Sequence, residues 1–137
     1  MILNISEAAN LGIHALSYLA NYSVDKTPIS TVQVARAFKV SENHLSKVFQ
    51  RLTKMGLVKS IRGPRGGFLL AKDPGEITLL QIYEAIDGPL TTGEHCMLGT
   101  PTCGYEHCIF GNLAKNVEND VYQRFSTKTL QDLIEDK

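Results

Sequence analysis

SENHLSKVFQRLTKMGLVKSIRGPRGGFLLA, residues 41–71, is the stretch of this sequence that decides the fold. Ser41 is a good helix N-cap, and the apolar residues after it recur every three or four positions, as on the buried side of a helix. The predicted buried residues are Leu45, Val48, Phe49 and Leu52. Ser30 opens a shorter helix before it, and Gly56 can end the second helix in a left-handed conformation. Two short helices joined by Lys39 and Val40 predict a helix-turn-helix.

A β-hairpin is predicted directly after the second of these helices. Residues 57–61 and 67–71 have the length and the apolar content of strands. The residues between them, Arg62-Gly63-Pro64-Arg65-Gly66, form a turn that no helix could tolerate. A hairpin in this position is called a wing, so residues 41–71 predict a winged helix-turn-helix.

Further helices flank this unit. The first, capped by Ser6, is predicted to end near Asn21–Tyr22. Thr78 with Gln81 three residues later has the pattern of a capping box for a helix through Ile86. After residue 108, apolar residues recur close to every fourth position and predict a long amphipathic helix. These residues are Ile109, Leu113, Val117, Val121 and Phe125. Thr127 or Thr129 would cap a last short helix.

The predicted fold class is mainly α, a winged helix-turn-helix DNA-binding domain with a two-stranded β wing and a long C-terminal dimerisation helix. We expect residues 1–88 to form the DNA-binding domain, residues 89–108 a cysteine-rich cluster-binding loop, and residues 109–137 the dimerisation helix with a short terminal helix. Since the first domain looks complete, the apolar stripe of the long helix is predicted to pack on a partner subunit. Packing on its own domain is the alternative.

The charge distribution favours nucleic-acid binding, although the formal net charge of the chain is zero. Residues 36–72 contain nine basic residues and one acidic residue, a net charge of +8. Residues 91–137 contain four basic and seven acidic residues, a net charge of −3. A basic middle beside an acidic tail is the electrostatic pattern of a phosphate-binding face. The alternative, a solvated lysine-rich surface, usually has acids interspersed among the bases.

The first turns of the second helix of a helix-turn-helix face the base edges in the major groove. The polar residues predicted to read DNA there are Ser41, Asn43, His44, Ser46 and Lys47. Arg51 could meet phosphates or bases, and Ser41 is in any case an ordinary helix cap. In the wing, arginine suits a narrow minor groove, and glycine allows a close backbone approach. The predicted wing contacts are Arg62, Gly63, Pro64, Arg65 and Gly66.

Length and composition narrow the class of protein. The 137 residues fit one domain, or one domain with an appended dimerisation element. The chain has no basic leader and no apolar run of about 20 residues, which predicts a cytoplasmic protein that does not enter the membrane. It has no phosphate-binding loop, nucleophile elbow or paired acid–base constellation, so an enzyme is not expected. Three cysteines exclude a complete set of disulfides and favour free thiols or metal ligation.

Residues 45–71 closely resemble the signature of the Rrf-type bacterial regulators, the family of IscR, NsrR, RirA and CymR. The segments LGIHALSYLA (11–20), RGPRGG (62–67) and ITLLQIYEAIDG (77–88) and the cysteine loop follow that family in order. The resemblance implies a homodimer in which the long helix after the cysteines forms the interface. It also implies that the dimer binds double-stranded DNA at a pseudo-palindromic operator, whose half-sites mirror the two-fold symmetry.

The three cysteines, Cys96, Cys103 and Cys108, are spaced C-x6-C-x4-C in a loop rich in Gly, Thr and Pro. Thiolates bind iron–sulfur clusters and zinc, but this loop lacks the closely spaced cysteine pair of compact zinc sites. In the family, three cysteines at about this spacing bind a [2Fe–2S] or [4Fe–4S] cluster, so the resemblance implies an iron–sulfur cofactor. The more usual family spacing is C-x5-C-x5-C, and the departure from it leaves the cluster type open.

Three cysteines leave the fourth ligand of the cluster unassigned. Members similar to IscR have a histidine three residues after the last cysteine, where this chain has Gly111. Other members take the ligand from the first helix of the partner subunit, and the matching positions are His14, Asn10 and Glu7. His14 is preferred because neutral imidazole is a good iron ligand. His95 and His107, beside the cysteines, are the other candidates; for each histidine an ordinary surface role is the alternative.

Together with the resemblance, these patterns predict a homodimeric DNA-binding transcriptional regulator, acting as a repressor, whose iron–sulfur cluster senses redox state, nitric oxide or iron. One alternative is a cluster-free regulator whose cysteines oxidise to a sulfenate or a disulfide. Another is a metabolite-responsive regulator that binds a partner enzyme through its acidic C-terminal half.

Overall fold

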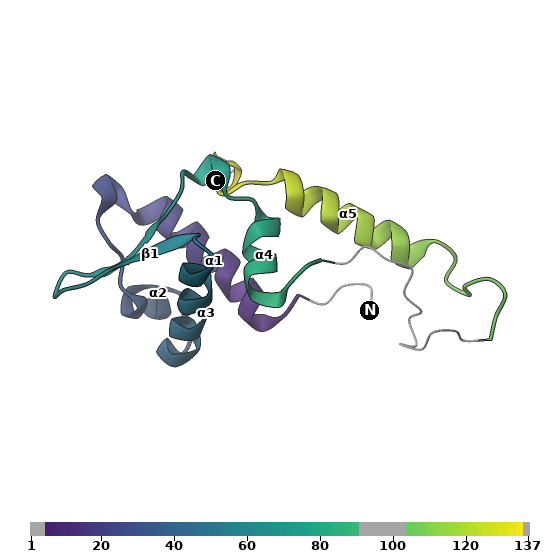
Figure 1. The fold of residues 1–137 in the computed structure, drawn as a ribbon, viewed down its shortest axis with the longest axis horizontal. Helices are drawn as coiled ribbons and strands as arrows, with labels where there is room; N and C mark the ends of the chain where they lie inside the picture. Colours follow the sequence, from purple (N-terminus) through teal and green to yellow (C-terminus); the bar gives the residue numbers. More distant parts are fainter. Residues whose placement is uncertain (1–4, 91–103, 136–137) are drawn as a thin grey trace.

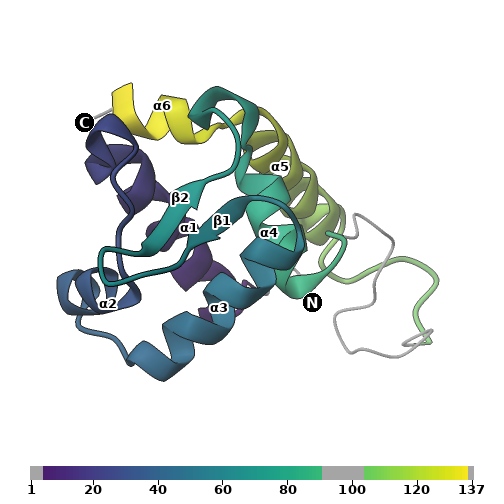
Figure 2. The same cartoon turned by 60° about the vertical axis from the view of Figure 1, so that its left-hand side comes forward.

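The computed structural model describes residues 5–90 and 104–135 of the chain (Figures 1 and 2). Its elements, in order, are α1 (Glu7–Tyr22), η1 (Val24–Lys26), α2 (Thr31–Phe38), α3 (Glu42–Lys54), β1 (Val58–Ile61), β2 (Gly67–Leu70), η2 (Pro74–Glu76), α4 (Leu79–Asp87), α5 (Leu113–Thr127) and α6 (Leu130–Glu135). The helix-turn-helix predicted from the sequence is α2 and α3, and the wing is the β1–β2 hairpin. The predicted winged-helix fold is therefore confirmed.

Polar caps explain where the helices begin. The side chains of Ser6, Ser30, Ser41 and Thr78 each accept a hydrogen bond from a backbone amide in the first turn of the helix that follows. At Thr78 the Gln81 side chain accepts a hydrogen bond from the cap amide in return, at 2.9 Å. This completes the capping box that the sequence predicted.

The core is built around α1, which contacts α3, α4 and α6. Its fully buried side chains include those of Leu16, Leu19, Leu45, Phe49, Leu52 and Ile82. Gly12 of α1 lies so close to α4 that a Cβ in its place would overlap the Ile86 side chain. The four apolar residues predicted to line α3 are all buried. Burial of these side chains is the main source of stability for the three helices.

The wing is anchored to the core at its base. β1 and β2 are antiparallel, with Val58 opposite Leu70 and Ile61 opposite Gly67. An extended residue before α2, Ile29, adds a third segment, because its amide and carbonyl both bond to Phe68, at 3.1 and 2.8 Å. The Phe68 ring stacks on Phe49 of α3, with centroids 4.3 Å apart. In Figure 2 the hairpin lies in front of α1, which β2 contacts.

The long helix begins later than its apolar repeat indicates. α5 starts at Leu113, and Ile109 lies in the turn before it, so the prediction that Ile109 belongs to the helix is wrong. The cause is local, because Gly111 has a φ of 61° and its amide bonds to the Cys108 carbonyl at 2.9 Å, which closes a turn there. Figure 1 shows α5 on the side of the molecule away from the wing.

The last helix, α6, packs against the winged-helix part of the molecule. Thr129, and not Thr127, caps α6, because its hydroxyl accepts the Asp132 amide at 3.3 Å. Leu130 is fully buried, and its amide bonds to the Ile77 carbonyl at 3.0 Å. α6 therefore packs on α1 and η2, a contact that the sequence did not indicate. Within the described ranges, none of the helices has the length and apolarity to cross a lipid bilayer.

Candidate nucleic-acid interface

The helix α3 presents one polar side to solvent. Its apolar residues face the core, and the turn before it is made possible by Lys39, which is left-handed with a φ of 56°. Of the residues predicted to read DNA, Ser41, Asn43 and Lys47 are exposed, and His44 and Ser46 are half-buried. The Ser41 hydroxyl accepts the His44 amide at 3.3 Å. The first turns of α3 can thus offer polar side chains to a major groove.

The wing tip depends on its glycines. Arg62, Gly63, Pro64 and Arg65 are exposed, and Gly66 is half-buried. Gly63 has a φ of 117°, and the Gly66 amide bonds to the Gly63 carbonyl at 2.9 Å. A Cβ on Gly66 would overlap the Ile61 carbonyl. This tight turn carries both arginines at the end of the hairpin, which extends past α2 and α3 in Figure 1.

The basic side chains of this face are not neutralised by acids. Within residues 5–90 and 104–135, the salt bridge present joins Arg124 to Asp120 on α5, at 3.3 Å. Lys47, Arg62 and Arg65 have no carboxylate within 4 Å in that part of the chain. Exposed unpaired cations on a recognition helix and a wing suit the phosphate contacts that dominate affinity for DNA.

Arg51 is placed differently from the other predicted DNA contacts. Its Nη1 donates a hydrogen bond to the Ile86 carbonyl in the last turn of α4, at 2.6 Å. Close by, the Ser6 amide and hydroxyl donate to the Asp87 carboxylate at 3.1 and 2.5 Å. The carbonyls of a last helical turn lack intrahelical partners, and a guanidinium satisfies one of them. Arg51 thus ties α3 to the end of α4, and its DNA contact stays a prediction.

A hollow of about 420 Å³ lies between α1 and the start of α3. It is lined by the three candidate ligands of the first helix, Glu7, Asn10 and His14, and by two of the predicted DNA contacts, Ser41 and His44. The rest of the lining is Leu11, Phe38, Lys39 and Val40. Their spacing of three and four residues places Glu7, Asn10 and His14 on one side of α1. The sequence predicted each group separately, and the structure brings the two groups together.

The His14 ring is oriented by two contacts. Its Nδ1 lies 2.8 Å from the Asn10 carbonyl, and its ring meets the Phe38 ring edge-on, with centroids 5.8 Å apart. Because a carbonyl can only accept, Nδ1 donates in this contact, which leaves Nε2 as the ring nitrogen that could bind a metal. A metal-binding histidine commonly donates its other ring N–H to a backbone carbonyl in this way. The donor chemistry at His14 therefore fits an iron ligand.

Only some of the other candidate cluster ligands lie among the described residues. Cys96, Cys103 and His95 lie outside the described residues. Cys108 and His107 are exposed in the segment before α5. Over residues 5–90 and 104–135, no three His, Cys, Asp or Glu side chains come together as a metal site. The ligand set beyond His14 therefore stays a prediction.

Comparison with known proteins places these features in a family. A model described as Rrf2, iron-dependent transcriptional regulator, matches residues 5–136. An HTH-type transcriptional regulator of Aquifex aeolicus is 33% identical over 132 residues, covering 94% of this chain and 90% of that protein. NsrR of Bacillus licheniformis is 29% identical over 139 residues, covering 96% and 92%. The structure of CymR, the global cysteine regulator of B. subtilis, is similar with a TM-score of 0.81 at 27% identity, covering 98% of both chains.

Proposed function

The chain belongs to the Rrf2 family of transcriptional regulators, and its relatives are regulators and not enzymes. From this we propose that it is a cytoplasmic homodimer that binds a pseudo-palindromic operator. We further propose that it represses transcription under the control of an iron–sulfur cluster. The cluster would respond to redox state, nitric oxide or iron supply. The observation that carries this proposal is the hollow in which His14 meets the turn before α3.

The proposed reading of DNA divides between two elements. Asn43, His44 and Lys47 at the start of α3 would meet base edges in the major groove. Arg62 and Arg65 would enter the neighbouring minor groove from the wing. Since two recognition helices of a dimer read half-sites about 34 Å apart, a small change in their relative orientation changes operator affinity.

The proposed dimer interface is formed by α5 and by the turn that precedes it, residues 109–112. At the C-terminal end of the helix, Phe125 packs edge-on against Tyr83 of α4, with centroids 6.1 Å apart, so that part packs on its own domain. The side chains of Ile109 and Leu113 are 67% and 53% exposed, and Phe110 and Tyr122 are also exposed. A second copy of α5 would remove this apolar surface from water, which favours association.

The proposed cofactor site takes its thiolates from Cys96, Cys103 and Cys108 and its fourth ligand from His14. An iron–sulfur cluster supplies chemistry that oxidants and nitric oxide can alter. The chain supplies the connection to DNA, because the His14 ring rests against Phe38, the last residue of α2. Lys39 and Val40 follow Phe38 and lead into α3. A change in the orientation of the His14 ring would therefore alter the packing of the turn that positions the recognition helix.

A second candidate function is regulation by thiol chemistry without a cluster. The similarity to CymR and the exposed thiol of Cys108 favour it. Oxidation of a cysteine to a sulfenate or disulfide, or docking of a partner enzyme, would then replace the cluster as the signal.

Anaerobic purification separates the two proposals. We expect coloured protein with visible charge-transfer bands, bound iron and sulfide, and an operator affinity that differs between the cluster-loaded and cluster-free forms. Colourless protein with three titratable thiols per chain after anaerobic handling would contradict the cluster and support thiol chemistry.

A further inference from the structure

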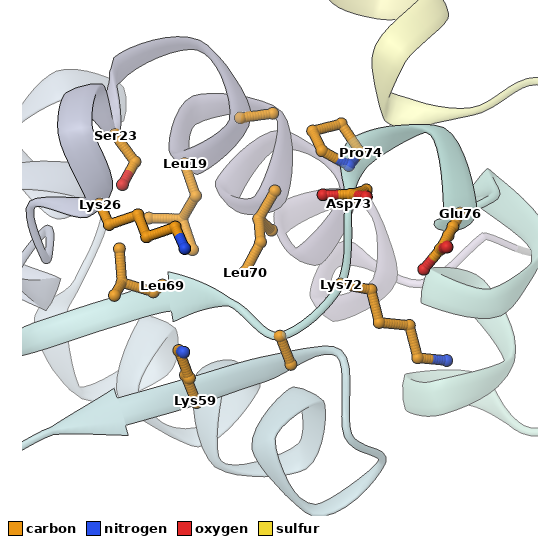
Figure 3. A pocket seen from close by; sticks show the side chains of 12 residues that line it. Leu19, Ser23, Lys26, Lys59, Leu69, Leu70, Lys72, Asp73, Pro74 and Glu76 are labelled. Carbon is orange, nitrogen blue, oxygen red and sulfur yellow. The ribbon is translucent and has the colours of Figure 1, made fainter.

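A second hollow, of about 460 Å³, lies between the end of α1, the base of the wing and η2 (Figure 3). We propose that it binds a small organic monoanion with an apolar body, of the class of medium-chain carboxylates. The site is distinct from the hollow beside His14, and the proposal holds whether or not the chain carries a cluster.

The floor of this hollow is apolar. It is formed by Leu19 from α1, Leu69 and Leu70 from β2, and Pro74 from η2. The Leu19 side chain is fully buried in the core and Leu69 is only 9% exposed, so the accessible apolar surface of the floor comes mainly from the half-buried Leu70 and Pro74. The volume falls within the range of small-molecule sites, which are mostly apolar with a few placed polar groups. The floor suits a hydrocarbon body of modest size.

The charges around the hollow favour a single negative charge. Three ammonium groups line it, those of Lys26, Lys59 and Lys72, against the two carboxylates of Asp73 and Glu76. None of the three lysines has a carboxylate within 4 Å among the described residues. Figure 3 shows Lys26 and Lys59 on the side of Leu69, and Lys72 and Glu76 on the opposite side. A carboxylate would therefore lie near Lys26 and Lys59, with its apolar body over Leu70 and Pro74.

The loop that carries Lys26 is held in an uncommon conformation. Asp25 and Lys26 have φ values of 52° and 59°, in the left-handed region that residues with side chains rarely adopt. Such conformations persist only where the surrounding structure holds them, and they concentrate at ligand sites. A ligand there would contact this loop and both strands of the wing at once. It would thereby fix the hairpin relative to α1.

The test is a titration of the full-length 15N-labelled protein with sodium octanoate, followed by amide chemical shifts. We expect saturable shifts confined to the residues that line the hollow and their neighbours, 19–26, 58–60 and 69–76. Octan-1-ol, which has the same chain without the charge, should bind at least about tenfold more weakly, because each charge-assisted contact is worth roughly that factor. No saturable shift, or shifts centred on α5, would overturn the proposal.

Charge removal gives the second arm of this experiment. The double variant K26Q/K59Q should bind octanoate at least about tenfold more weakly, whereas K54Q, which removes a lysine outside the hollow, should bind it like the wild type. Amide spectra of each variant report whether the fold is intact. If K26Q/K59Q keeps its octanoate affinity and instead loses affinity for DNA, these lysines serve phosphates and the proposed site is wrong.

Discussion

Replacing Gly67 with alanine tests how the wing is held to the core. A Cβ on Gly67 would overlap the carbonyl of Ile29 and approach the amide of Ser30. Both are backbone atoms that cannot rotate away, so the chain can relieve the overlap only by separating Ile29 from Phe68. We therefore expect Gly67→Ala to detach the base of the wing from the segment before α2.

The loss of stability can be estimated from the contacts that break when Ile29 and Phe68 separate. Two backbone hydrogen bonds join Ile29 and Phe68, and each contributes roughly 0.5–1.5 kcal/mol net. Displacement of Phe68 also weakens its stacking on Phe49, and such a pair contributes roughly 0.5–1.5 kcal/mol beyond the area it buries. We expect the free energy of unfolding to fall by about 1.5–4.5 kcal/mol in total.

Two other glycines provide matched controls. Gly75→Ala places a Cβ 4.0 Å from the Gln131 Cβ, an ordinary contact, so its effect should stay within about 0.5 kcal/mol. Gly63→Ala meets no atom within 4 Å but forces alanine to a φ of 117°, so it isolates backbone strain, at about 1 kcal/mol.

The assay is urea unfolding followed by circular dichroism at one protein concentration, with operator affinity measured in parallel. The expected order of destabilisation is Gly67→Ala, then Gly63→Ala, then Gly75→Ala. If Gly67→Ala and Gly75→Ala agree within about 0.5 kcal/mol, the Ile29–Phe68 pairing does not anchor the wing, and the reasoning fails.

Three further predictions concern the DNA-binding side chains, the proposed fourth ligand and the cap of α6. Lys47→Gln should weaken operator binding and reduce its salt slope by about one. Arg51→Gln should lower the free energy of unfolding by about 1 kcal/mol, because Arg51 bonds to α4, and it should change the salt slope less than Lys47→Gln does; an equal loss of slope in both variants would show that Arg51 contacts DNA as strongly as Lys47. His14→Ala should change the visible spectrum and lifetime of the cluster, and His107→Ala should not; a spectrum and lifetime untouched by His14→Ala would rule out the preferred fourth ligand. Hydrogen bonds from the Thr129 amide and hydroxyl hold the pKa of the Asp132 carboxyl below its usual value. The ionised carboxylate therefore stabilises the fold above about pH 4, the pKa of the unfolded chain. This stabilisation is lost as the pH falls through the lower pKa of the folded chain. Asp132→Asn should flatten this acid dependence of the unfolding free energy, and an unchanged dependence would show that the Thr129–Asp132 cap does not titrate with stability.

The elements of the fold were predictable where the signal is local. Caps at Ser30, Ser41 and Thr78 and the periodicity of α3 mark helices without reference to the rest of the chain. The start of α5 was misplaced because apolar spacing continued through Ile109, while the left-handed Gly111 interrupts the helix. A glycine can continue or end such a repeat, and the spacing alone does not distinguish the two outcomes.

The contacts that build the site lie between residues far apart in the sequence, and that is why they could not be predicted. The Ile29–Phe68 pairing and the Arg51–Ile86 bond span 39 and 35 residues, and neither leaves a pattern in the residues around it. For Arg51 the sequence predicted a DNA contact, as for other basic residues on a recognition helix, and did not indicate its bond to α4. For His14 the sequence indicated a ligand, but not that the ring touches the end of α2.

These long-range contacts hold the recognition helix at both ends. At its start, the His14–Phe38 contact joins α1 to the turn that precedes α3. At its end, Arg51 bonds to the last turn of α4, immediately before residues 89–108 with their three cysteines. Ser6 ties the start of α1 to Asp87 in that same last turn. The contacts of His14, Arg51 and Ser6 therefore connect α3 and the turn before it to α1 and to the last turn of α4, the helix that precedes the cysteine segment.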